Sequence, residues 1–374
     1  MTAPPDMFAR TPGRSARLTS PAAPSSLLPS SAAPRGVIAN PATLQSVAWE
    51  LDALADRIGA PSTSRPAWLL PGFEPTKTAR PWAVLLRDPD DVLRAAVGAV
   101  DWSDGQAQAG GGSDPVLRSV NEVHRAALLA ESDELARQLG QAVDAELRGR
   151  TGPVRVAFGP LPADSSATAA FADGFQAATL VEASPIPAIR RDSGTNVDDY
   201  LTSSLRRTLR KARNRIESDG RRLVTTFERR PAQVAEMLPA VEFAHRERDH
   251  ARGLPSELDQ APTTARWRRR MRGLGDAGRL EIGLAYLDGQ LAAHVVGIID
   301  GSTYRVLEGH LVTRWSRYAP GRLLEAEVVQ RMLDEPSLTS LDWMTSVAPE
   351  ALLAMNTAEP VVTIRVGTGT GWGE

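Results

Sequence analysis

Glu308 and His310 are the two residues of this sequence best suited to moving a proton. They lie two residues apart in the strand-like run 303–310, and the alternation of a β-strand turns such residues to one face. A carboxylate and an imidazole together can deprotonate an incoming ammonium group, directly or through water. The polar outer face of an exposed edge strand would carry the same pair, so both interpretations stay open.

The other histidines in this half of the chain are weaker candidates. His294 lies within the apolar run 291–299, where a lone histidine is more often a hydrogen-bonded structural residue than a base. His245 and His250 lie with Glu242 and Asp249 on a charged helix. A solvated face or the wall of an acceptor pocket explains that helix better than a metal site, because no second ligand cluster exists. We therefore expect no metal.

The turn from Arg317 to Arg322 is the second segment with chemical potential. Pro320 presets the backbone of a first helical turn, and Gly321 lets the backbone come close to a ligand. The unpaired N–H groups and the positive dipole end of a helix start attract anions, and the two arginines can add charged hydrogen bonds. An ordinary Pro-Gly helix start would have the same sequence.

A run of basic residues precedes these segments: Arg206, Arg207, Arg210, Lys211, Arg213 and Arg215. Such a run can bind tRNA, a nucleotide or an anionic glycan. The aromatic residues that stack on single-stranded bases are missing nearby, which favours a solvated helix face over a nucleic-acid surface.

Two Asp-Gly steps reveal the elements that must position these residues. Asp288-Gly289 and Asp300-Gly301 separate apolar runs rich in β-forming residues, and Asp-Gly favours the positive φ angles of tight hairpins. We therefore predict a three-stranded antiparallel meander over 280–310, then a helix over 323–333 and a strand at 340–344. Upstream, the pattern predicts a helix over 199–219, a strand over 223–227, a helix over 234–248 and a basic helix around 267–274.

The N-terminal part of the chain has an α/β pattern of its own. Residues 1–36 are rich in Pro, Ala and Ser, which predicts a disordered tail. We then expect a helix from residue 44, strands over 82–87 and 92–100, a flexible loop at 105–113, a helix over 128–147 and a strand over 154–158. This organisation suggests two domains, 37–190 and 191–374.

The composition limits the class of protein. A chain of 374 residues, 42% of them hydrophobic, suits two domains, and a net charge of -2 does not call for a polyanionic partner. Because Cys is 0, disulfides, thiolate metal sites and a Cys nucleophile are excluded. No apolar run approaches the roughly 18 residues that span a bilayer. No signal peptide is evident, so we expect a cytoplasmic protein that does not bind membranes.

Three segments together resemble the GNAT acyltransferase superfamily and, more closely, its CelD-like (cellulose-biosynthesis) acetyltransferase branch. They are the helix 199–217, the 278–294 part of the meander, and Tyr318-Ala-Pro-Gly-Arg-Leu-Leu-Glu followed by Leu341-Asp-Trp. The resemblance covers about residues 41–360. It implies an α/β (α+β) fold of two GNAT-like halves, with mixed central sheets flanked by helices and the second half holding acetyl-CoA.

The resemblance also implies roles for single residues. The strand that carries Leu307 and Glu308 would lie beside the pantetheine arm of CoA, with Glu308 near the reacting thioester. The pyrophosphate would lie against the turn whose residues are Arg317, Pro320, Gly321, Arg322 and Leu323. Tyr318 and Tyr304 are candidates to protonate the leaving thiolate. Residues 349–356 lack the tyrosine that does so in many GNAT enzymes.

Two departures from the family pattern affect these roles. The pyrophosphate turn has one glycine, and Leu323 replaces its last small residue, as in the CelD-like branch. The general acid is unassigned, and solvent can serve instead. 

The reaction that fits best is direct transfer of an acetyl group from CoA to an amine on a small-molecule or glycan acceptor. No Ser/His/Asp or Cys constellation indicates a covalent intermediate. Two alternatives remain: an aminoacyl-tRNA-dependent peptidyltransferase of the FemABX kind, which would use the basic helix, and a catalytically silent binding protein with the same fold. The sequence gives no indication of the oligomeric state.

Overall fold

The computed structural model describes residues 35–72, 79–102, 116–119, 126–150, 154–192, 194, 196–344 and 354–368. Residues 1–34 of the predicted tail and the predicted loop 105–113 lie outside these ranges. Arg35 and Gly36 begin a β-strand, so the predicted tail was two residues too long.

The N-terminal half alternates strands and helices, as predicted. One prediction was wrong in detail. Ser132 accepts a hydrogen bond from the Leu135 backbone N–H and so starts a helix at Asp133, whereas residues 129–130 form a short strand. The elements are β1 Arg35–Ala39, α1 Pro41–Ser46, α2 Ala48–Arg57, α3 Pro66–Leu69, β2 Ala79–Arg87, β3 Leu93–Trp102, β4 Val116–Ser119, β5 Leu129–Ala130, α4 Asp133–Arg148, β6 Val154–Pro162, α5 Ser166–Asp173 and β7 Ala178–Arg190.

The C-terminal half contains the predicted meander and helices. The helix predicted over 199–219 is interrupted, because Asn196 caps one short helix and Thr202 caps a second, longer one. The elements are α6 Val197–Tyr200, α7 Ser203–Ser218, β8 Leu223–Glu228, α8 Pro231–Ala251, α9 Ala261–Asp276, β9 Leu280–Leu287, β10 Gln290–Asp300, β11 Thr303–Leu311, α10 Pro320–Asp334, β12 Ser340–Asp342 and β13 Thr357–Thr368.

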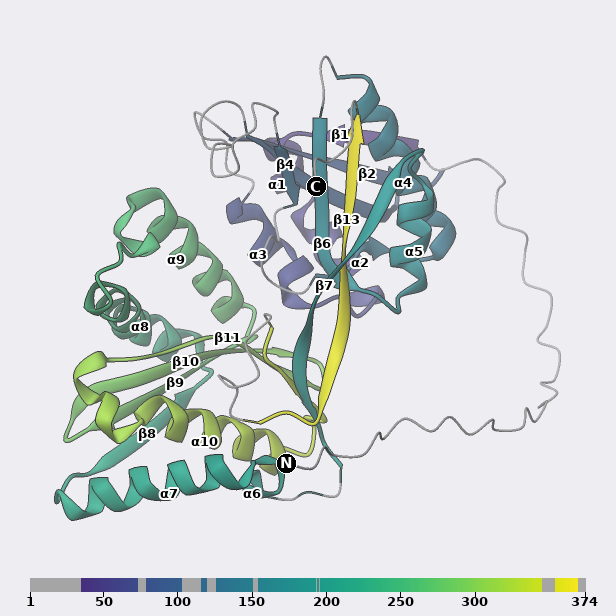
Figure 1. Cartoon of the computed structure of the whole chain (residues 1–374). Coiled ribbons are helices and arrows are strands. Elements are labelled where there is room, and N and C mark those ends of the chain that lie inside the picture. Colours follow the sequence, from purple (N-terminus) through teal and green to yellow (C-terminus); the bar gives the residue numbers. More distant parts are fainter. Residues whose placement is uncertain are drawn as a thin grey trace, which may run out of the picture.

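A continuous sheet runs through both halves (Figure 1). Its order along the main path is β1-β2-β3-β4-β6-β13-β7-β12-β11-β10-β9-β8. The predicted architecture of two α/β halves with flanking helices is therefore confirmed. The place of β13 was not predicted: it pairs antiparallel with β6 on one side and β7 on the other. The division at residue 190 remains a prediction, and β7 and β13 join the halves across it.

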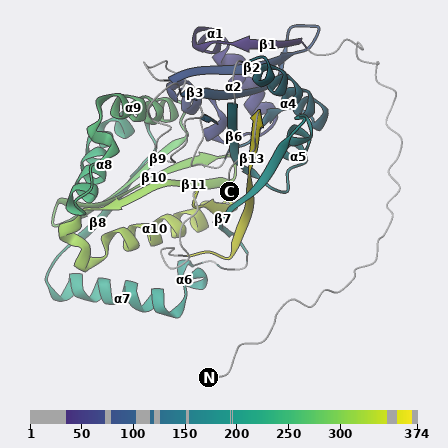
Figure 2. The ribbon, with the colours of Figure 1, turned by 45° about the horizontal axis from the view of Figure 1, so that its top comes forward.

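Helices cover both faces of the sheet in the C-terminal half (Figures 1 and 2). Val234, Leu238 and Met271 of α8 and α9 pack with Leu280 and Ile282 of β9 on one face. On the other face, α7 and α10 pack against the alternate residues of the same strands, such as Ala285 and Leu287. Burial on both sides explains why β9 and β10 are almost continuous apolar runs.

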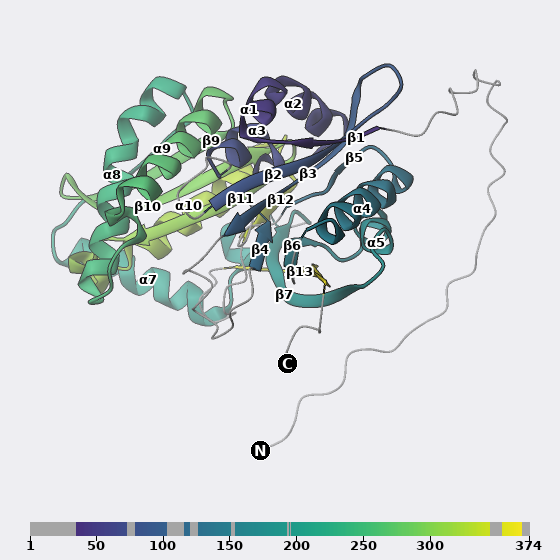
Figure 3. The ribbon, with the colours of Figure 1, turned by 90° about the horizontal axis from the view of Figure 1, so that it is seen from above.

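The N-terminal half has the same layered arrangement (Figure 3). Leu44, Leu51 and Leu54 of α1 and α2 pack against one face of β2 and β3. Leu139 and Val143 of α4, together with α5, cover the other face. Among the described residues, no helix combines the length and apolarity needed to cross a bilayer.

Candidate active site

The third strand of the meander carries a β-bulge where Glu308 leaves the regular pattern. Glu308 pairs with Val296 of β10, whereas Val306 pairs with the next residue, Gly297, so Leu307 is an extra residue. Val306 belongs to the core under α7 and α10, and Leu307 belongs to the core under α8 and α9. Glu308 also contacts α8. The bulge therefore directs two successive side chains, Leu307 and Glu308, toward α8.

The same strand separates from its parallel neighbour beyond the bulge. β11 pairs with β12 at only three positions, Thr303, Tyr304 and Arg305. From Val306 to Leu311, β11 continues without a β12 partner. The strand edge beside Glu308 can therefore offer backbone N–H and C=O groups to an extended ligand.

Glu308 is the centre of a cluster of histidines. Its carboxylate lies 3.4 Å from Nδ1 of His245 and 3.7 Å from Nε2 of His294. The His310 ring lies edge-on to both of these rings, with centroid distances of 4.6 Å to His245 and 5.3 Å to His294. Nε2 of His245 lies 3.6 Å from the Asp249 carboxylate. Three of the protein's 5 histidines thus converge on one carboxylate.

These groups strongly perturb one another's pKa values. Burial favours the neutral form of Glu308, but His245 and His294 outweigh it and hold the pKa of that carboxyl well below its usual range. Burial, together with the neighbouring His294, lowers the pKa of His310 to about 3. Burial lowers the pKa of His245, but the Glu308 carboxylate more than compensates and raises it above the usual value. At neutral pH, Glu308 is therefore anionic and His310 neutral.

Several polar atoms of the cluster have no hydrogen-bond partner among the described residues. They are both ring nitrogens of His294, Nδ1 of His245 and Oε1 of Glu308. The His294 side chain is 0% exposed and that of Glu308 is 15% exposed. An unsatisfied buried polar group costs roughly 1–3 kcal/mol, so a ligand that satisfied these atoms would stabilise the cluster.

The start of α10 has no side-chain cap, which leaves its first N–H groups available to an anion. Its first residue, Pro320, follows Ala319, which has left-handed backbone angles of φ 47° and ψ 46°, and no side chain caps the helix. A Cβ atom on Gly321 would lie 3.7 Å from Leu311, an ordinary contact, so packing does not demand glycine there. The Leu323 side chain is buried in the core, and its N–H donates to the Ala319 carbonyl. The Leu323 side chain is therefore directed into the core and not toward a ligand at this helix start.

The two arginines of the turn contact carboxylates. Arg317 forms an ion pair with Asp219 at 2.5 Å and is 60% exposed, so its guanidinium can rearrange. Arg322 forms an ion pair with Glu325 at 2.9 Å.

The structure places both candidate tyrosines outside the Glu308 cluster. Tyr318 is buried, and its hydroxyl donates to Asp219 at 2.7 Å and accepts from Arg221 at 2.8 Å. Tyr304 is also buried, and burial raises the pKa of its hydroxyl well above the usual value. Neither hydroxyl is an obvious proton donor to a group at Glu308.

His245 is the cluster residue that the sequence analysis assigned to a solvated or pocket-lining helix face. It is buried, as are Val234, Leu238 and Val241 of α8. These four residues have the spacing of a single helix face. That spacing was the available signal, because it puts His245 where the next core residue of α8 is expected. Its partner Glu308 is 63 positions away in the sequence, so periodicity within the helix could not identify the contact.

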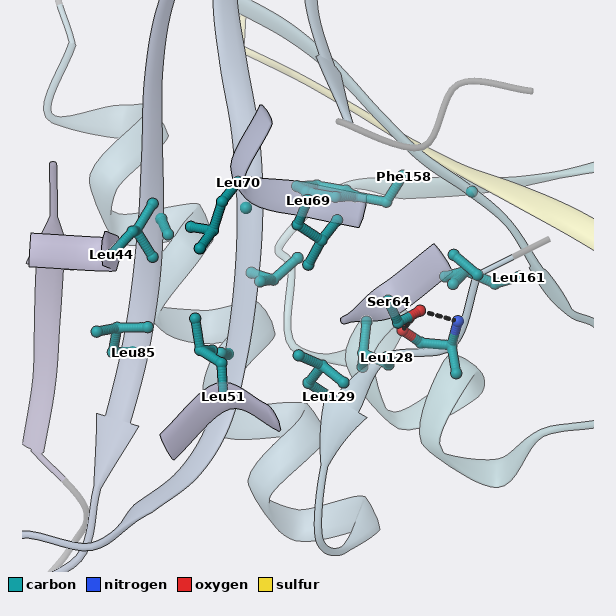
Figure 4. Close-up of a pocket in the computed structure, with 17 residues that line it drawn as sticks. Leu44, Leu51, Ser64, Leu69, Leu70, Leu85, Leu128, Leu129, Phe158 and Leu161 are labelled. Atoms are coloured by element: carbon teal, nitrogen blue, oxygen red, sulfur yellow. Dashed lines mark hydrogen bonds between the residues drawn. The ribbon is translucent and has the colours of Figure 1, made fainter. Parts of the chain in front are cut away.

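A small hollow lies in the N-terminal half (Figure 4). It has a volume of about 70 Å³ and is lined mainly by leucine, alanine and other apolar side chains. Its main polar feature is Ser64, which accepts from the Ala127 N–H at 2.8 Å and donates to the Ala127 carbonyl at 3.1 Å. No titratable side chain lines the hollow, so it offers no acid or base.

The segment that carries the Glu308 cluster is similar to a known family of domains. Residues 203–350 match the family model described as Acetyltransferase (GNAT) domain. This match agrees with the resemblance to the GNAT superfamily over the C-terminal part of the chain. The finer assignment to the CelD-like branch remains a prediction. No curated protein gives a significant match to the sequence.

One solved structure shares the fold over most of the chain, and two others align with lower scores. A conserved protein of unknown function from Bacteroides thetaiotaomicron VPI-5482 aligns with a TM-score of 0.51 and 11% identity, covering 85% of this chain and 97% of its own. A tandem GNAT protein from the clavulanic acid biosynthesis pathway aligns at 0.47 and 15%, covering 90% and 99%. FemX aligns at 0.47 and 10%, covering 81% and 83%. At an identity this low, structural similarity indicates a shared fold and does not indicate a shared substrate.

Proposed function

We propose that the protein is an acyl-CoA-dependent N-acyltransferase and that its C-terminal half performs the reaction. This proposal rests on two features found together at the end of β11, a strand edge separated from β12 and an uncapped helix start. There the strand edge separates from β12 beside Glu308, and an uncapped helix start follows nine residues after the strand ends. An extended donor with an anionic end needs both features.

The donor would be acetyl-CoA. The amide groups of its pantetheine arm would pair with the backbone of β11 beyond Arg305, near Leu307. Its pyrophosphate would lie against the N–H groups of Gly321 and Arg322, where the helix dipole favours negative charge. Arg317 would exchange Asp219 for a phosphate oxygen.

The acceptor would be an amine of a small molecule or a glycan. Its nitrogen would attack the thioester carbonyl, so that an amide bond forms and the carbon–sulfur bond breaks. Glu308 would take the proton that the ammonium loses, while His245, His294 and His310 position the carboxylate. The low pKa of Glu308 makes it a weak base, so the acyl transfer would rely strongly on substrate positioning. Solvent, or Tyr318 after a rearrangement, would protonate the leaving thiolate.

One observation supports the FemABX-like alternative. Arg207, Arg210, Lys211 and Arg213 are exposed along α7 and form a continuous cationic face. Transfer of an aminoacyl group from charged tRNA, with no turnover of acetyl-CoA, would favour this alternative. CoA binding without turnover on any amine or hydroxyl would favour a silent binding protein. We propose the cytoplasm as the site of action, since acetyl-CoA is the donor.

A thermal-shift titration with acetyl-CoA tests the proposal. A ligand at about 100 times its dissociation constant should stabilise the native state by roughly 2.7 kcal/mol. Desulfo-CoA and free acetate serve as controls for the thioester and for the acyl group alone. A melting temperature that stays flat up to millimolar acetyl-CoA would rule the proposal out. An amine library with detection of released thiol then identifies the acceptor.

A further inference from the structure

The Glu308 cluster has more nitrogen ligands than proton transfer requires. A single base needs one partner to orient it, whereas Glu308 is surrounded by His245, His294 and His310. Burying three imidazoles around one carboxylate is costly unless their nitrogens are bonded. Nδ1 of His245 and both nitrogens of His294 have no hydrogen-bond partner among the described residues. Of these, Nδ1 belongs to His245, one of the possible metal ligands, so its lone pair is available to a cation.

The ligand atoms are already close to the spacing of a metal site. One atom from each of His245, Glu308 and His310 can be chosen so that all lie within 4.8 Å of one another. Tetrahedral zinc, with bonds of about 2.0–2.2 Å, places its ligand atoms about 3.3–3.6 Å apart. The separation of Nδ1 of His245 from Oε2 of Glu308 is 3.4 Å, within that range.

We propose that His245, Glu308 and His310 bind a divalent zinc ion. Two imidazoles and one carboxylate form a ligand set that suits zinc and leaves a further coordination position for water or a substrate. Magnesium is a poor fit, because it prefers oxygen ligands and keeps most of its water. This proposal goes beyond acyl transfer and does not depend on it.

Two neighbouring side chains, Asp249 and His294, could hold these ligands in place. Metal-bound histidines usually donate their other ring N–H to a carboxylate or carbonyl. Nε2 of His245 lies 3.6 Å from the Asp249 carboxylate, on the opposite side of the ring from Glu308. His294, which is fully buried, lies 3.7 Å from Oε1 of Glu308 and would hold the carboxylate in place.

Zinc at this position would compete with acyl transfer. The lone pair of Glu308 that coordinates zinc cannot accept a proton from the acceptor amine. The same carboxylate therefore has two uses that exclude each other, and zinc would lower the rate of acyl transfer without occupying the helix start at Gly321.

Calorimetric titration of the chelator-treated full-length protein with ZnCl₂ tests the inference. We expect one zinc ion per chain. His245→Gln and His310→Gln should each weaken zinc binding by more than about 100-fold, because each removes a ligand. Asp249→Asn should weaken it by about 10–100-fold, the range typical of an outer-shell partner. Elemental analysis of the purified protein gives an independent readout of bound zinc.

His250→Gln is the matched control. His250 lies on the same helix, is half exposed and contacts Asp259 at 2.7 Å, outside the cluster. It should bind zinc like the wild-type protein. Circular dichroism and the melting temperature establish whether each variant folds. If a ligand variant does not fold, Asp249→Asn still tests the zinc site. Absence of saturable zinc binding, or unchanged affinity in His245→Gln and His310→Gln, would overturn the proposal.

Two separate titrations keep this inference distinct from the proposed function. Acetyl-CoA is titrated in the presence of chelator, and zinc is titrated in the absence of CoA. Zinc binding without CoA binding would leave the metal site standing and remove the acyltransferase. CoA binding without zinc binding would support the acyltransferase and overturn the zinc site.

Discussion

The helix starts of α4 and α10 differ in the two features that decide whether a helix binds an anion. Ser132 caps α4 and bonds to the Leu135 N–H, and Asp133 and Glu134 occupy its first turn. α10 has neither a side-chain cap nor an acidic residue in its first turn. Acidic residues at a helix start stabilise the helix by occupying the positive end of its dipole, and they repel a phosphate there. The first turn of α4 thus stabilises the helix itself, whereas the first turn of α10 has no group that would repel the anion that we propose there.

The interiors of the two halves differ in the same way. The N-terminal hollow is lined by apolar side chains and contains no acid or base (Figure 4). The C-terminal half buries a carboxylate among three imidazoles, several of whose atoms have no partner in the described parts of the chain. Two halves with related layers can therefore divide the work. On the proposed function, the C-terminal half carries the chemistry and accepts a cost in stability for it.

The largest expected effect is a loss of turnover when the carboxylate charge is removed from the C-terminal cluster. Glu308→Gln keeps the shape of the side chain and should lower turnover by about 10²–10⁴-fold, with little change in CoA affinity, because it removes a positioned base. Steady-state kinetics with an identified amine provide the measurement, and His250→Gln is the control. Near-normal turnover of Glu308→Gln, with loss in His294→Ala or His310→Ala, would assign the base to an imidazole. Activity in all three variants would leave proton removal to solvent.

A second variant gives α10 the acidic start of α4. Gly321→Asp should leave folding intact, since a Cβ atom fits there and an acidic residue favours a helix start. It should abolish the roughly 2.7 kcal/mol stabilisation by excess acetyl-CoA, because the new carboxylate repels phosphate. Gly321→Asn, which has nearly the same shape without the charge, is the matched control and should retain most of the thermal shift. Equal shifts in the two variants would mean that the pyrophosphate does not lie at this helix start.

Filling the N-terminal hollow should have a smaller effect, and only on stability. Ala96 is buried and lines the hollow, and Ala96→Val adds two carbon atoms to it on a strand that favours valine. We expect a gain of up to about 1 kcal/mol in the free energy of unfolding, as is common for cavity-filling changes, and unchanged CoA binding. Chemical denaturation and the acetyl-CoA titration measure the two quantities. Loss of CoA binding in Ala96→Val would show that the N-terminal half also takes part in donor binding.

Removal of the predicted tail should have the smallest effect. Its Pro/Ala/Ser composition offers few side chains for burial, so deletion of residues 1–34 should leave the melting temperature and CoA binding unchanged. Deletion of residues 1–39 is the contrasting variant, because it also removes β1, which pairs with β2 over five positions. That longer deletion should lower the melting temperature. A decrease of several degrees with the shorter deletion alone would mean that the tail packs against the folded protein.

Local sequence signals predicted the meander well and the cluster only in part. Asp288, Gly289 and Gly301 have positive φ angles of 51°, 77° and 57°, as the Asp-Gly steps required. Strand alternation also brought Glu308 and His310 to one site. The bulge at Leu307 was not predicted, because it depends on how β11 pairs with β10 and not on local preference.

Contacts between elements distant in sequence explain the remaining differences. His245 meets Glu308 because α8 packs on β11, and Thr313 at the end of that strand donates to Glu247 of the same helix. Nothing within the α8 segment specifies that neighbour. The place of β13 is a similar case. No strand was predicted over residues 357–368, and the choice of β6 and β7 as its partners is decided by the assembled sheet.

The position of β13 between β6 and β7 has a consequence for the order in which the protein can mature. A ribosome releases the N-terminal half long before residues 357–368 exist, and within the described chain β7 gains its long partner only when that last strand arrives. Until then, β6 and β7 each present an open strand edge, a known route to aggregation. Residues 357–368 must therefore be synthesised before the strands of the first half can pair as they do in the folded protein.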